Sequence, residues 1–465
     1  MQTRNAYVHM HLRGTFVPAG LLTVVEDGRR SSCAFQYGNR YLERADAVPV
    51  DPVQLPLAGA RGLRFDGPVG GDLFGGIRDA SPDAWGRHIL DISVDRHGEN
   101  AGLQLSELDY LLRAGPDRIG ALGFSVRLDE SPFAFSTRQT ATLPGAELDL
   151  EALLTAADAV DNEEDLEPRY RRFFVRGSSL GGARPKAAVE LDGRHWIAKF
   201  DRAREAWPTC RIEHGCMRLA RLCGIDVPDT KVVRVLGGRD ILLVERFDRR
   251  PGQHGTERIP FVSGATMLGY TQSQAERGGS YPGLAAAMRR HCRADTLPQD
   301  LARLYLRMVF NAMVNNTDDH LRNHGFLYEQ KDGQYGQGSG QYGRGSGQYV
   351  RGSGQYGQGS GWTLSPAYDL VPQPIMGNDD AEVRTLSLTI GEQGRLATER
   401  HLVESGGPFA LAKDEARHLV AGLKEIIASE WEQVFREAGV PSRSFSELRA
   451  CLAPGLSARP GDAAQ

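Results

Sequence analysis

The spacing of apolar and polar positions changes along the chain and separates a strand-rich part from a helical part. Between Val8 and Leu12 apolar residues alternate with polar ones, which is typical of a half-buried strand. The dipeptide Asp27-Gly28 stands between the apolar runs LLTVV and CAFQY and predicts a hairpin turn. The first third of the chain is therefore expected to consist largely of strands and turns.

The middle of the chain combines short apolar runs with one helical segment. The runs KAAVEL, HWIAKF, KVVRVL and ILLVERF read as strands. Between the second and third runs, Ile212, Cys216, Leu219 and Leu222 recur at helical spacing. Strands, a helix and further strands make up the small lobe of a protein kinase, although many α+β domains share this order.

In the last third, apolar residues three and four positions apart predict helices, most clearly in residues 301–313 and 419–434. Residues 334–361 interrupt this pattern with four tandem seven-residue units, QYGQGSG, QYGRGSG, QYVRGSG and QYGQGSG. Gly/Ser-rich chain cannot bury enough surface to offset the entropy lost on ordering, so we expect a disordered loop. Contacts of its tyrosines with nucleic acid, or self-association, are the alternative.

Composition and charge narrow the picture only slightly. A net charge of −4 gives no overall attraction to DNA or to an anionic membrane. The N-terminal segment lacks a signal-peptide core, and no apolar run approaches the ~18 residues of a membrane helix. The six cysteines are scattered without a CxxC pair, which favours free thiols over a zinc site. We therefore expect a cytoplasmic protein without a membrane partner.

The segment NTDDHLRN, residues 316–323, follows a predicted helix and carries the clearest candidate chemistry. Asp318 and Asn323 are five positions apart, as are the base and the metal-binding asparagine of protein-kinase catalytic loops. Phosphoryl transfer needs one carboxylate near the attacking hydroxyl and an amide oxygen on the same loop to hold Mg²⁺. Asp369, which ends a short apolar strand, would supply a Mg²⁺ carboxylate. Because Asn and Asp also form ordinary turns, a simple loop is the alternative.

A strand and a glycine-rich segment supply candidate phosphate contacts. Lys199 lies in the strand HWIAKF, where lysine is rare unless its charge has a partner. Glu213 on the next helix is the candidate partner, as in the Lys–Glu ion pair of kinases, and an exposed helical glutamate is the alternative. Residues 177–186, GSSLGGARPK, precede the strand AAVEL. Their glycines and Lys186 suit a loop that covers phosphates.

Five segments, in this order, resemble the HipA family of Ser/Thr kinase toxins: GSSLGGARPKAAVEL, HWIAKF, LLVERFDRR, NTDDHLRNHGF and LSPAYDLVP. The N-terminal strands and RDASPDAWGR resemble the leading segment of that family. The resemblance implies an α+β, two-lobed protein-kinase-like fold, with a β-rich N-terminal lobe, an extra N-terminal β subdomain and a mainly α-helical C-terminal lobe. The expected parts are the extra subdomain at 1–130, the small lobe at 131–247, the helical lobe at 248–455 and a flexible tail at 456–465.

The resemblance also implies ATP and Mg²⁺ as cofactors and gives roles to single residues. Asp318 would be the catalytic base, Asn323 and Asp369 the Mg²⁺ ligands, and His320 a support of the catalytic loop. Lys199 would bind the α- and β-phosphates. Nucleotide contacts are expected from Ser179, Leu180, Gly181, Gly182, Ala183, Arg184, Lys186, Lys199, Glu245, Arg246, Phe247, Tyr368 and Asp369.

Two of these segments have further implied roles. Glu245 to Phe247 would form the hinge strand, which holds adenine through backbone hydrogen bonds. Ser179, or the adjoining Ser178, matches the serine that such kinases phosphorylate on themselves. A phosphate there adds nearly two negative charges beside the ATP phosphates, so it would silence the enzyme.

The sequence departs from the family pattern at two places. Arg322 stands where the family usually has lysine, which keeps the charge but not the geometry. The Gly-rich repeat separates GFLYEQ from WTLSPAYD, which read as two strands of one hairpin. Because each doubling of loop length costs only about 0.6 kcal/mol, Asp318 and Asp369 are expected to stay together.

The resemblance implies a Ser/Thr protein kinase that acts as the toxin of a toxin–antitoxin pair. Expected partners are a protein substrate, such as an aminoacyl-tRNA synthetase, and a small helix-turn-helix antitoxin through which DNA is contacted indirectly. Because a fold does not fix its substrate, a small-molecule kinase is one alternative. A non-catalytic corepressor that bridges antitoxin on DNA is another, although the intact set Lys199, Asp318, Asn323 and Asp369 argues against it.

Overall fold

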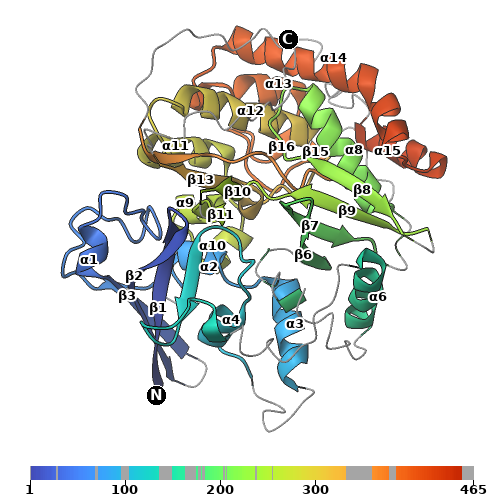
Figure 1. Cartoon of the computed structure of the whole chain (residues 1–465). Coiled ribbons are helices and arrows are strands. Elements are labelled where there is room, and N and C mark those ends of the chain that lie inside the picture. The colour runs from blue at the N-terminus through green and yellow to red at the C-terminus, as the bar shows by residue number, and fades with distance from the viewer. Residues whose placement is uncertain are drawn as a thin grey trace. The chain divides into compact units, whose positions relative to one another are not determined.

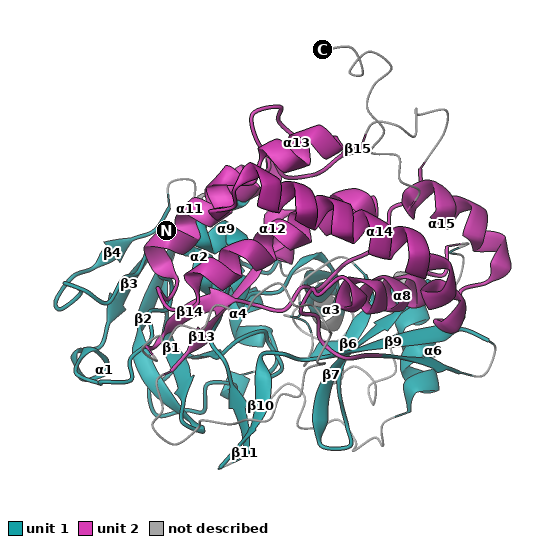
Figure 2. Cartoon of the chain, turned by 90° about the horizontal axis from the view of Figure 1, so that it is seen from above, with its two compact units in different colours: residues 1–205, 231–272 teal, residues 206–230, 273–465 magenta. Residues whose placement is uncertain are grey.

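The computed structural model of the 465-residue chain has several sheets and a large helical part (Figure 1). It describes residues 2–27, 30–68, 72–95, 104–135, 149–162, 174–175, 178, 180, 184–202, 205, 207–235, 238–253, 255–330, 359–375 and 384–452. The chain divides into two compact units (Figure 2). Unit 1 comprises residues 1–205 and 231–272, and unit 2 comprises residues 206–230 and 273–465. The predicted domain limits at 130 and 247 stay a prediction.

Unit 1 begins with a five-stranded sheet in the order β4-β3-β2-β1-β5. Its strands are β1 (Gln2–Leu12), β2 (Thr15–Asp27), β3 (Arg30–Tyr37), β4 (Phe65–Asp66) and β5 (Leu122–Ser125). Asp27 pairs with Arg30, so the hairpin predicted at this point is confirmed.

The expectation of a half-buried strand is wrong for residues 8–12, which are all buried. β1 is an internal strand, and the polar residues His9 and His11 are held by other parts of unit 1. His9 Nε2 lies 2.8 Å from Ser125 Oγ on β5, and the backbone N–H of Arg258 donates to His11 Nδ1 at 3.3 Å. Internal hydrogen bonds thus replace water on the face that was predicted to be exposed.

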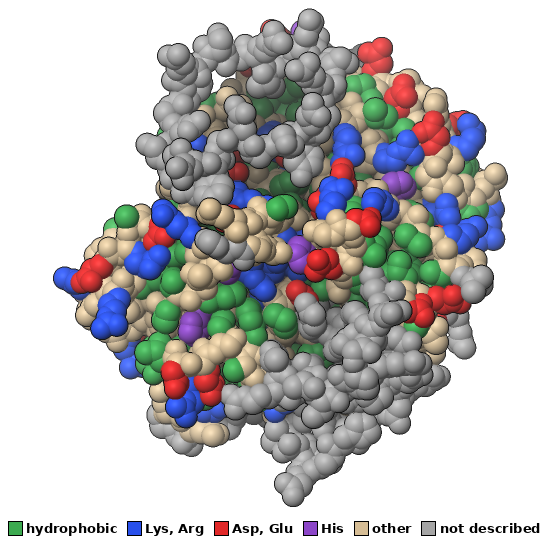
Figure 3. Space-filling model, in the orientation of Figure 1, with side chains coloured by type: hydrophobic (Ala, Val, Ile, Leu, Met, Phe, Trp, Pro, Cys, Tyr) green, Lys and Arg blue, Asp and Glu red, His purple; other side chains and the backbone are tan. Residues whose placement is uncertain are grey.

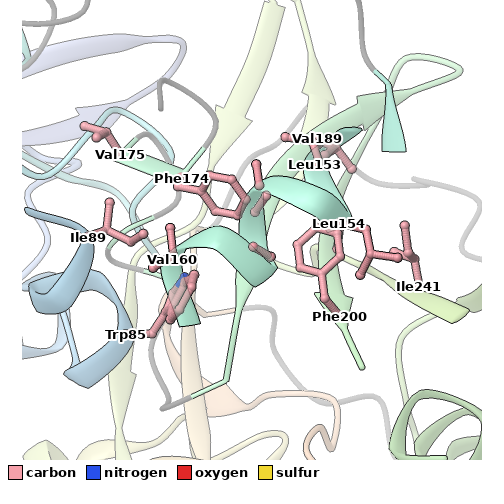
Figure 4. Packing of buried hydrophobic residues seen from close by; sticks show 14 of the residues in the cluster. Trp85, Ile89, Leu153, Leu154, Val160, Phe174, Val175, Val189, Phe200 and Ile241 are labelled. Carbon is pink, nitrogen blue, oxygen red and sulfur yellow. The ribbon is translucent and has the colours of Figure 1, made fainter. Parts of the chain in front are cut away.

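A second sheet of unit 1 has the order β6-β7-β9-β8. Its strands are β6 (Lys186–Leu191), β7 (Arg194–Phe200), β8 (Thr230–Arg234) and β9 (Asp240–Glu245), which confirms the four predicted strand runs. Helices α3 (Ala84–Asp95) and α6 (Leu150–Asp161) contribute to the apolar core of this sheet (Figure 4). The core contains Trp85, Ile89, Leu153, Leu154, Val160, Phe174, Val175, Val189, Phe200 and Ile241.

The remaining elements of unit 1 are short. The helices are α1 (Asn39–Leu42), α2 (Gly75–Asp79), α4 (Glu107–Arg113) and α9 (Gly264–Met267), and the strands are β10 (Arg249–Gly252), β11 (Gly255–Arg258) and β12 (Phe261–Ser263).

Charged residues of both signs are interspersed on the face drawn in Figure 3. This distribution fits the nearly balanced charge of the sequence.

Unit 2 is mainly helical, as the spacing of apolar residues predicted. Its helices are α8 (Thr209–Leu222), α11 (Tyr281–His291), α12 (Leu297–Met313), α13 (Glu399–Glu404), α14 (Lys413–Glu437) and α15 (Phe445–Leu452), and α10 (Gln272–Glu276) begins at the border between the units. Short 3-10 helices are η1 (Leu321–Asn323), η2 (Gly407–Phe409) and η3 (Ser442–Ser444). In the described part of the chain, none of the helices is both long and apolar enough to cross a membrane.

Unit 2 also holds two small antiparallel pairs, β13 (Gly325–Glu329) with β14 (Gly361–Leu364), and β15 (Arg384–Thr385) with β16 (Leu396–Ala397). β13 and β14 pair from Phe326↔Leu364 to Glu329↔Gly361. The two flanks of the Gly-rich repeat therefore form one hairpin, as predicted. Residues 334–358 of the repeat lie outside the described residues.

Candidate active site

The end of α12 places the candidate catalytic loop. The helix ends at Met313 with Val314 as its C-cap, and Asn315 has a left-handed backbone with φ of 54°. The N–H of Asn316 donates to the carbonyl of Asn311 at 2.9 Å, and the N–H of Asn315 donates to that of Ala312 at 3.4 Å. These two bonds form a Schellman motif, and asparagine is one of the few residues that accept the left-handed position. The sequence therefore turns the chain sharply just before Asp318.

Short-range hydrogen bonds hold the loop 316–323 in shape. The N–H of His320 donates to the carbonyl of Asp318, and the N–H of Asn323 donates to that of His320, both at 2.9 Å. The side-chain Nδ2 of Asn323 also donates to the Asp318 carbonyl, at 2.8 Å. The amide nitrogen of Asn323 is thus occupied within the loop, and its oxygen is the atom suited to a cation. Asp318 and His320 are exposed.

The two neighbouring aspartates of this loop have opposite surroundings. Asp318 is exposed, whereas Asp319 is fully buried. The Tyr281 hydroxyl donates to one carboxylate oxygen of Asp319 at 2.6 Å, and the N–H of Ser387 donates to the other at 2.9 Å. Burial raises the pKa of Asp319 to about 7, although both donors act in the opposite direction. Of the two carboxylates, only that of Asp318 is open to an incoming hydroxyl.

The segment around Asp369 is tied to the same loop. The Tyr368 hydroxyl donates to the carbonyl of Arg322 at 2.6 Å. Asn316 Nδ2 donates to the carbonyl of Asp369 at 3.3 Å. Asp369 itself has a left-handed backbone with φ of 54°, a conformation that aspartate tolerates better than most residues. The Asp369 backbone therefore lies beside the loop of Asp318, despite the repeat between them in the sequence.

Two further contacts hold the stretch that leads to Asp369. The N–H of Ala367 donates to the carbonyl of Asp226 at 2.7 Å. Arg307, buried on α12, donates from Nη2 to the carbonyl of Ser365 at 2.7 Å. These contacts fix the direction in which the chain leaves β14.

The candidate phosphate contacts of unit 1 lie on the hairpin β6–β7. Lys186 and Lys199 are direct partners across the two strands, so their side chains leave the same face of the sheet. Lys186 is buried and Lys199 half-buried. Two like charges directly opposite each other are unfavourable in a sheet unless an opposite charge accompanies them. The pairing places two lysine side chains on one face of the hairpin.

The glycine-rich segment is described only in part. Ser178 is buried, and its hydroxyl donates to the carbonyl of Val175 at 2.9 Å. Leu180 is half-buried, and Arg184 forms an ion pair with Glu205 at 2.6 Å. Ser179, Gly181, Gly182 and Ala183 lie outside the described residues. Their contacts with nucleotide stay predictions.

The predicted hinge continues β9. The guanidinium of Arg246 is buried and donates to Asp248 and to the carbonyls of Asp117 and Arg118. Its backbone N–H donates to the carbonyl of His195 at 2.9 Å, in line with the strand ladder. The side chain and the backbone N–H of Arg246 thus both form hydrogen bonds within unit 1. Only its carbonyl remains for the predicted adenine contact.

Glu245 and Phe247 flank Arg246 and also contact unit 1. Glu245 forms an ion pair with Arg194, and the ring of Phe247 lies 6.4 Å from that of Phe261. Glu213, the predicted partner of Lys199, is buried on α8 of unit 2. The alternative of an exposed helical glutamate is therefore wrong, while the ion pair with Lys199 in unit 1 stays a prediction.

The sequence interpretation missed several residues that support the loop. Tyr281, Asn311 and Ser387 contact it from three separate segments, and Arg384 donates from Nη1 to the carbonyl of Ala312 at 3.0 Å, where α12 ends. Asn311 interrupts the apolar stretch Met308–Met313 at the end of α12, which is a visible signal. The others are far away in the sequence, and no local pattern marks them.

Among the residues that the structure describes, no group of three His, Cys, Asp or Glu side chains is arranged to hold a metal ion. The predicted Mg²⁺ ligands combine an aspartate with an asparagine and therefore do not form such a group. Carboxylate and amide oxygens are nevertheless ligands that suit this hard cation.

Comparison with known proteins finds a family model that matches the part of the chain from the glycine-rich segment to the loop of Asp318. Residues 178–337 match the family model described as the HipA-like C-terminal domain. This match confirms the predicted family resemblance over these residues.

The fold of the whole chain is similar to a solved structure. A chain of the HipA, HipB and operator DNA complex of the Shewanella oneidensis MR-1 toxin–antitoxin system matches it with a TM-score of 0.60. The two sequences are 18% identical, and the match covers 96% of each chain. At this identity the match shows a shared mixed α/β fold.

Two curated relatives carry names of candidate kinases. Y4dM of Sinorhizobium fredii is 24% identical over 279 residues, 55% of this chain and 55% of that protein. A protein of Haemophilus influenzae is 24% identical over 168 residues, 33% of this chain and 48% of its own length. The chain spans about half the length of these two relatives.

Proposed function

We propose that this chain is an ATP- and Mg²⁺-dependent Ser/Thr protein kinase with two kinase-like lobes. The observation that carries the proposal is the junction of the two candidate segments, in which Asn316 contacts the backbone of Asp369 and Tyr368 contacts that of Arg322. A base on one segment and a metal ligand on the other is the arrangement that phosphoryl transfer needs. The names of the curated relatives support the same chemistry.

The residues of the loop have distinct tasks in this proposal. Asp318 accepts the proton of the substrate hydroxyl while the hydroxyl oxygen bonds to the γ-phosphorus and the bond to ADP breaks. Asn323, through its amide oxygen, and Asp369, through its carboxylate, would hold Mg²⁺. Bound Mg²⁺–ATP supplies the phosphoryl group and neutralises the charge on the leaving group. His320 helps to hold the loop in shape.

Lys186 and Lys199 provide the phosphate contacts of the proposal. Their side chains share one face of the β6–β7 hairpin, where the two ammonium groups could donate to phosphate oxygens. The expected main-chain hinge contact lies at residues 245–247.

Transfer of label from [γ-³²P]ATP in a cell lysate tests the proposal. Wild type should label a protein band, and Asp318→Asn should lower the rate by at least roughly a hundredfold because the base is lost. Asp414→Asn, an exposed change at the start of α14, is the matched control and should label like wild type. Label confined to small molecules would support a small-molecule kinase. Equal ATP turnover by wild type and Asp318→Asn would contradict the proposal and favour a corepressor.

We extend the proposal to a toxin role with a helix-turn-helix antitoxin as partner. The similar Shewanella chain was solved in a complex with HipB and operator DNA. This complex supports the proposal that an antitoxin links this chain to DNA as well. The substrate would be a protein of translation, such as an aminoacyl-tRNA synthetase. Expression of wild type should arrest growth, and Asp318→Asn should not; arrest by both would remove the kinase-dependent toxin role.

Autophosphorylation in the segment 177–186 would silence the kinase. Of the two candidate serines, Ser178 is buried with its hydroxyl bonded to the Val175 carbonyl, so phosphate would have to displace this contact. We therefore favour Ser179. Mass spectrometry after incubation with ATP should find phosphate in wild type and lose it in Ser179→Ala. Phosphate that persists in Ser179→Ala and disappears in Ser178→Ala would reverse the choice.

A further inference from the structure

Four polar side chains form an uninterrupted buried network beneath the candidate catalytic loop. Tyr281 and Asp319 are fully buried, and Asn311 and Asn316 are each 2% exposed. Tyr281 begins α11, Asn311 lies near the end of α12, and Asn316 and Asp319 belong to the loop. Buried polar groups are costly unless each finds a partner, so a chain of four calls for an explanation.

The hydrogen bonds of this network run in one direction. Asn316 Nδ2 donates to Asn311 Oδ1 at 3.0 Å, and Asn311 Nδ2 donates to the Tyr281 hydroxyl at 3.0 Å. The Tyr281 hydroxyl in turn donates to Asp319 at 2.6 Å. Along this chain of three bonds each donor points toward the carboxylate, which is the arrangement in which successive hydrogen bonds strengthen one another.

Both ends of the network meet backbone that carries candidate site residues. At one end Asn316 Nδ2 also donates to the carbonyl of Asp369. At the other end the second oxygen of Asp319 accepts the N–H of Ser387, and the Ser387 hydroxyl donates to the carbonyl of Thr317, next to Asp318. The network therefore links the backbone on which the candidate base stands to the backbone on which the candidate metal ligand stands.

We propose that Tyr281, Asn311 and Asp319 act as positioning residues that hold the loop of Asp318 in register with Asp369. The proposal rests on the kinase function proposed above, because it names what keeps the two halves of that site together. All three are buried, so none is open to a substrate. Replacing buried hydrogen-bonded partners by apolar groups of the same shape can be nearly neutral for stability, but it would give the loop no directional contacts.

Substitution at Tyr281 tests the proposal, with a matched control in the same unit. Tyr281→Phe removes only the hydroxyl and leaves Asp319 without one donor. Tyr305→Phe also removes a buried hydroxyl, which donates to the carbonyl of Leu402 at 2.8 Å, away from the loop. Tyr281→Phe should lower kcat for phosphoryl transfer roughly tenfold or more, since small misplacements of reacting groups are costly, and change the KM for ATP less than about threefold. Tyr305→Phe should leave kcat near that of wild type.

A double-variant cycle and rescue separate positioning from general stability. Asp319→Asn should lower kcat as Tyr281→Phe does, because the amide presents a donor where Tyr281 and Ser387 already donate. The double variant with Asp319→Asn and Tyr281→Phe should have a kcat no lower than that of the slower single variant. Both substitutions break the same chain of hydrogen bonds, so their effects should not add. Additive losses, or equal losses of kcat in Tyr281→Phe and Tyr305→Phe, would overturn the proposal.

Amide hydrogen exchange gives a readout that does not depend on kinase activity. Tyr281→Phe should speed exchange in peptides that cover 316–323 and 365–371, and Tyr305→Phe should not. If wild type transfers no phosphate but this pattern appears, the proposed function fails and the positioning network stands. If exchange in these peptides is unchanged by Tyr281→Phe, the positioning proposal fails whatever the activity.

Discussion

At the scale of single residues, neighbours in the sequence can have opposite tasks. Asp318 and Asp319 are chemically identical, and the sequence alone favours Asp318 only through its spacing from Asn323. The structure separates them by burial, because Tyr281 and Ser387 engage Asp319 from 38 and 68 residues away. No local pattern reports contacts of that range, so the supporting role of Asp319 was not predictable from the sequence.

The paired lysines of β6 and β7 lead to a prediction for nucleotide binding. Lys186→Ala and Lys199→Ala should each weaken ATP binding roughly tenfold to a hundredfold, the range for hydrogen bonds to charged groups. Lys231→Ala is the control, because Lys231 stacks over Trp196 on the same sheet and is not part of the pair. Isothermal titration calorimetry measures all three. Unchanged affinity in both Lys186→Ala and Lys199→Ala would remove the phosphate role of the hairpin.

The buried His9 leads to a prediction for stability against pH. Burial lowers the pKa of His9 to about 4 from its ordinary 6.5. The unfolded chain therefore takes up a proton on His9 near pH 6.5, whereas the folded chain resists it until about pH 4. The contribution of neutral His9 to the free energy of unfolding is fully present above pH 6.5 and is lost as the pH falls toward 4.

Urea unfolding at several pH values measures this contribution. The free energy of unfolding of wild type should fall relative to that of His9→Asn between pH 6.5 and 4. The comparison is made as a difference between the two proteins, because Asp51 and Asp319, whose pKa values are raised to about 6 and 7, act in the opposite direction in both. Parallel pH profiles would show that His9 is not held neutral.

At the scale of elements, periodicity predicted much of the fold. The predicted strands of the β6–β9 sheet and the helix α12 are present, and Leu301, Leu304 and Met308 are buried as expected. α14 differs in detail, because Val420 is buried and the predicted Leu419 is only half-buried. The strand β1 differs more, since its polar residues His9 and His11 have hydrogen-bond partners on β5 and β11. The spacing of polar residues does not tell whether a polar side chain is exposed to water or buried with a hydrogen-bond partner.

The hairpin β13–β14 explains how the repeat and the site coexist. Its strands pair up to Glu329↔Gly361, so the segment between them leaves and returns at one end of the hairpin. Deletion of residues 334–358 should therefore keep ATP-dependent phosphorylation within a few-fold of wild type and leave the melting temperature nearly unchanged. Rate assays and thermal unfolding test this expectation. Complete loss of activity in a folded deletion variant would mean that the repeat takes part in the function.

At the scale of the whole molecule, the sequence motifs predicted a resemblance to the HipA family, and the match of residues 178–337 to the HipA-like C-terminal family model confirms it. The division into two units was harder to predict. α8 follows β7 in the sequence but belongs to unit 2, where it packs on α14. The local sequence pattern of a helix shows that one of its faces is apolar. It does not show which other element covers that face, so it cannot assign the helix to a unit.

In the proposed function, Asp369 and Asn323 together bind the metal ion that accompanies ATP. Calorimetric titration of ATP into wild type and Asp369→Asn, with and without Mg²⁺, tests it most directly. Wild type should bind ATP clearly more tightly with Mg²⁺, and Asp369→Asn should lose most of this difference while it still binds metal-free ATP. An equal gain from Mg²⁺ in both proteins would contradict the account.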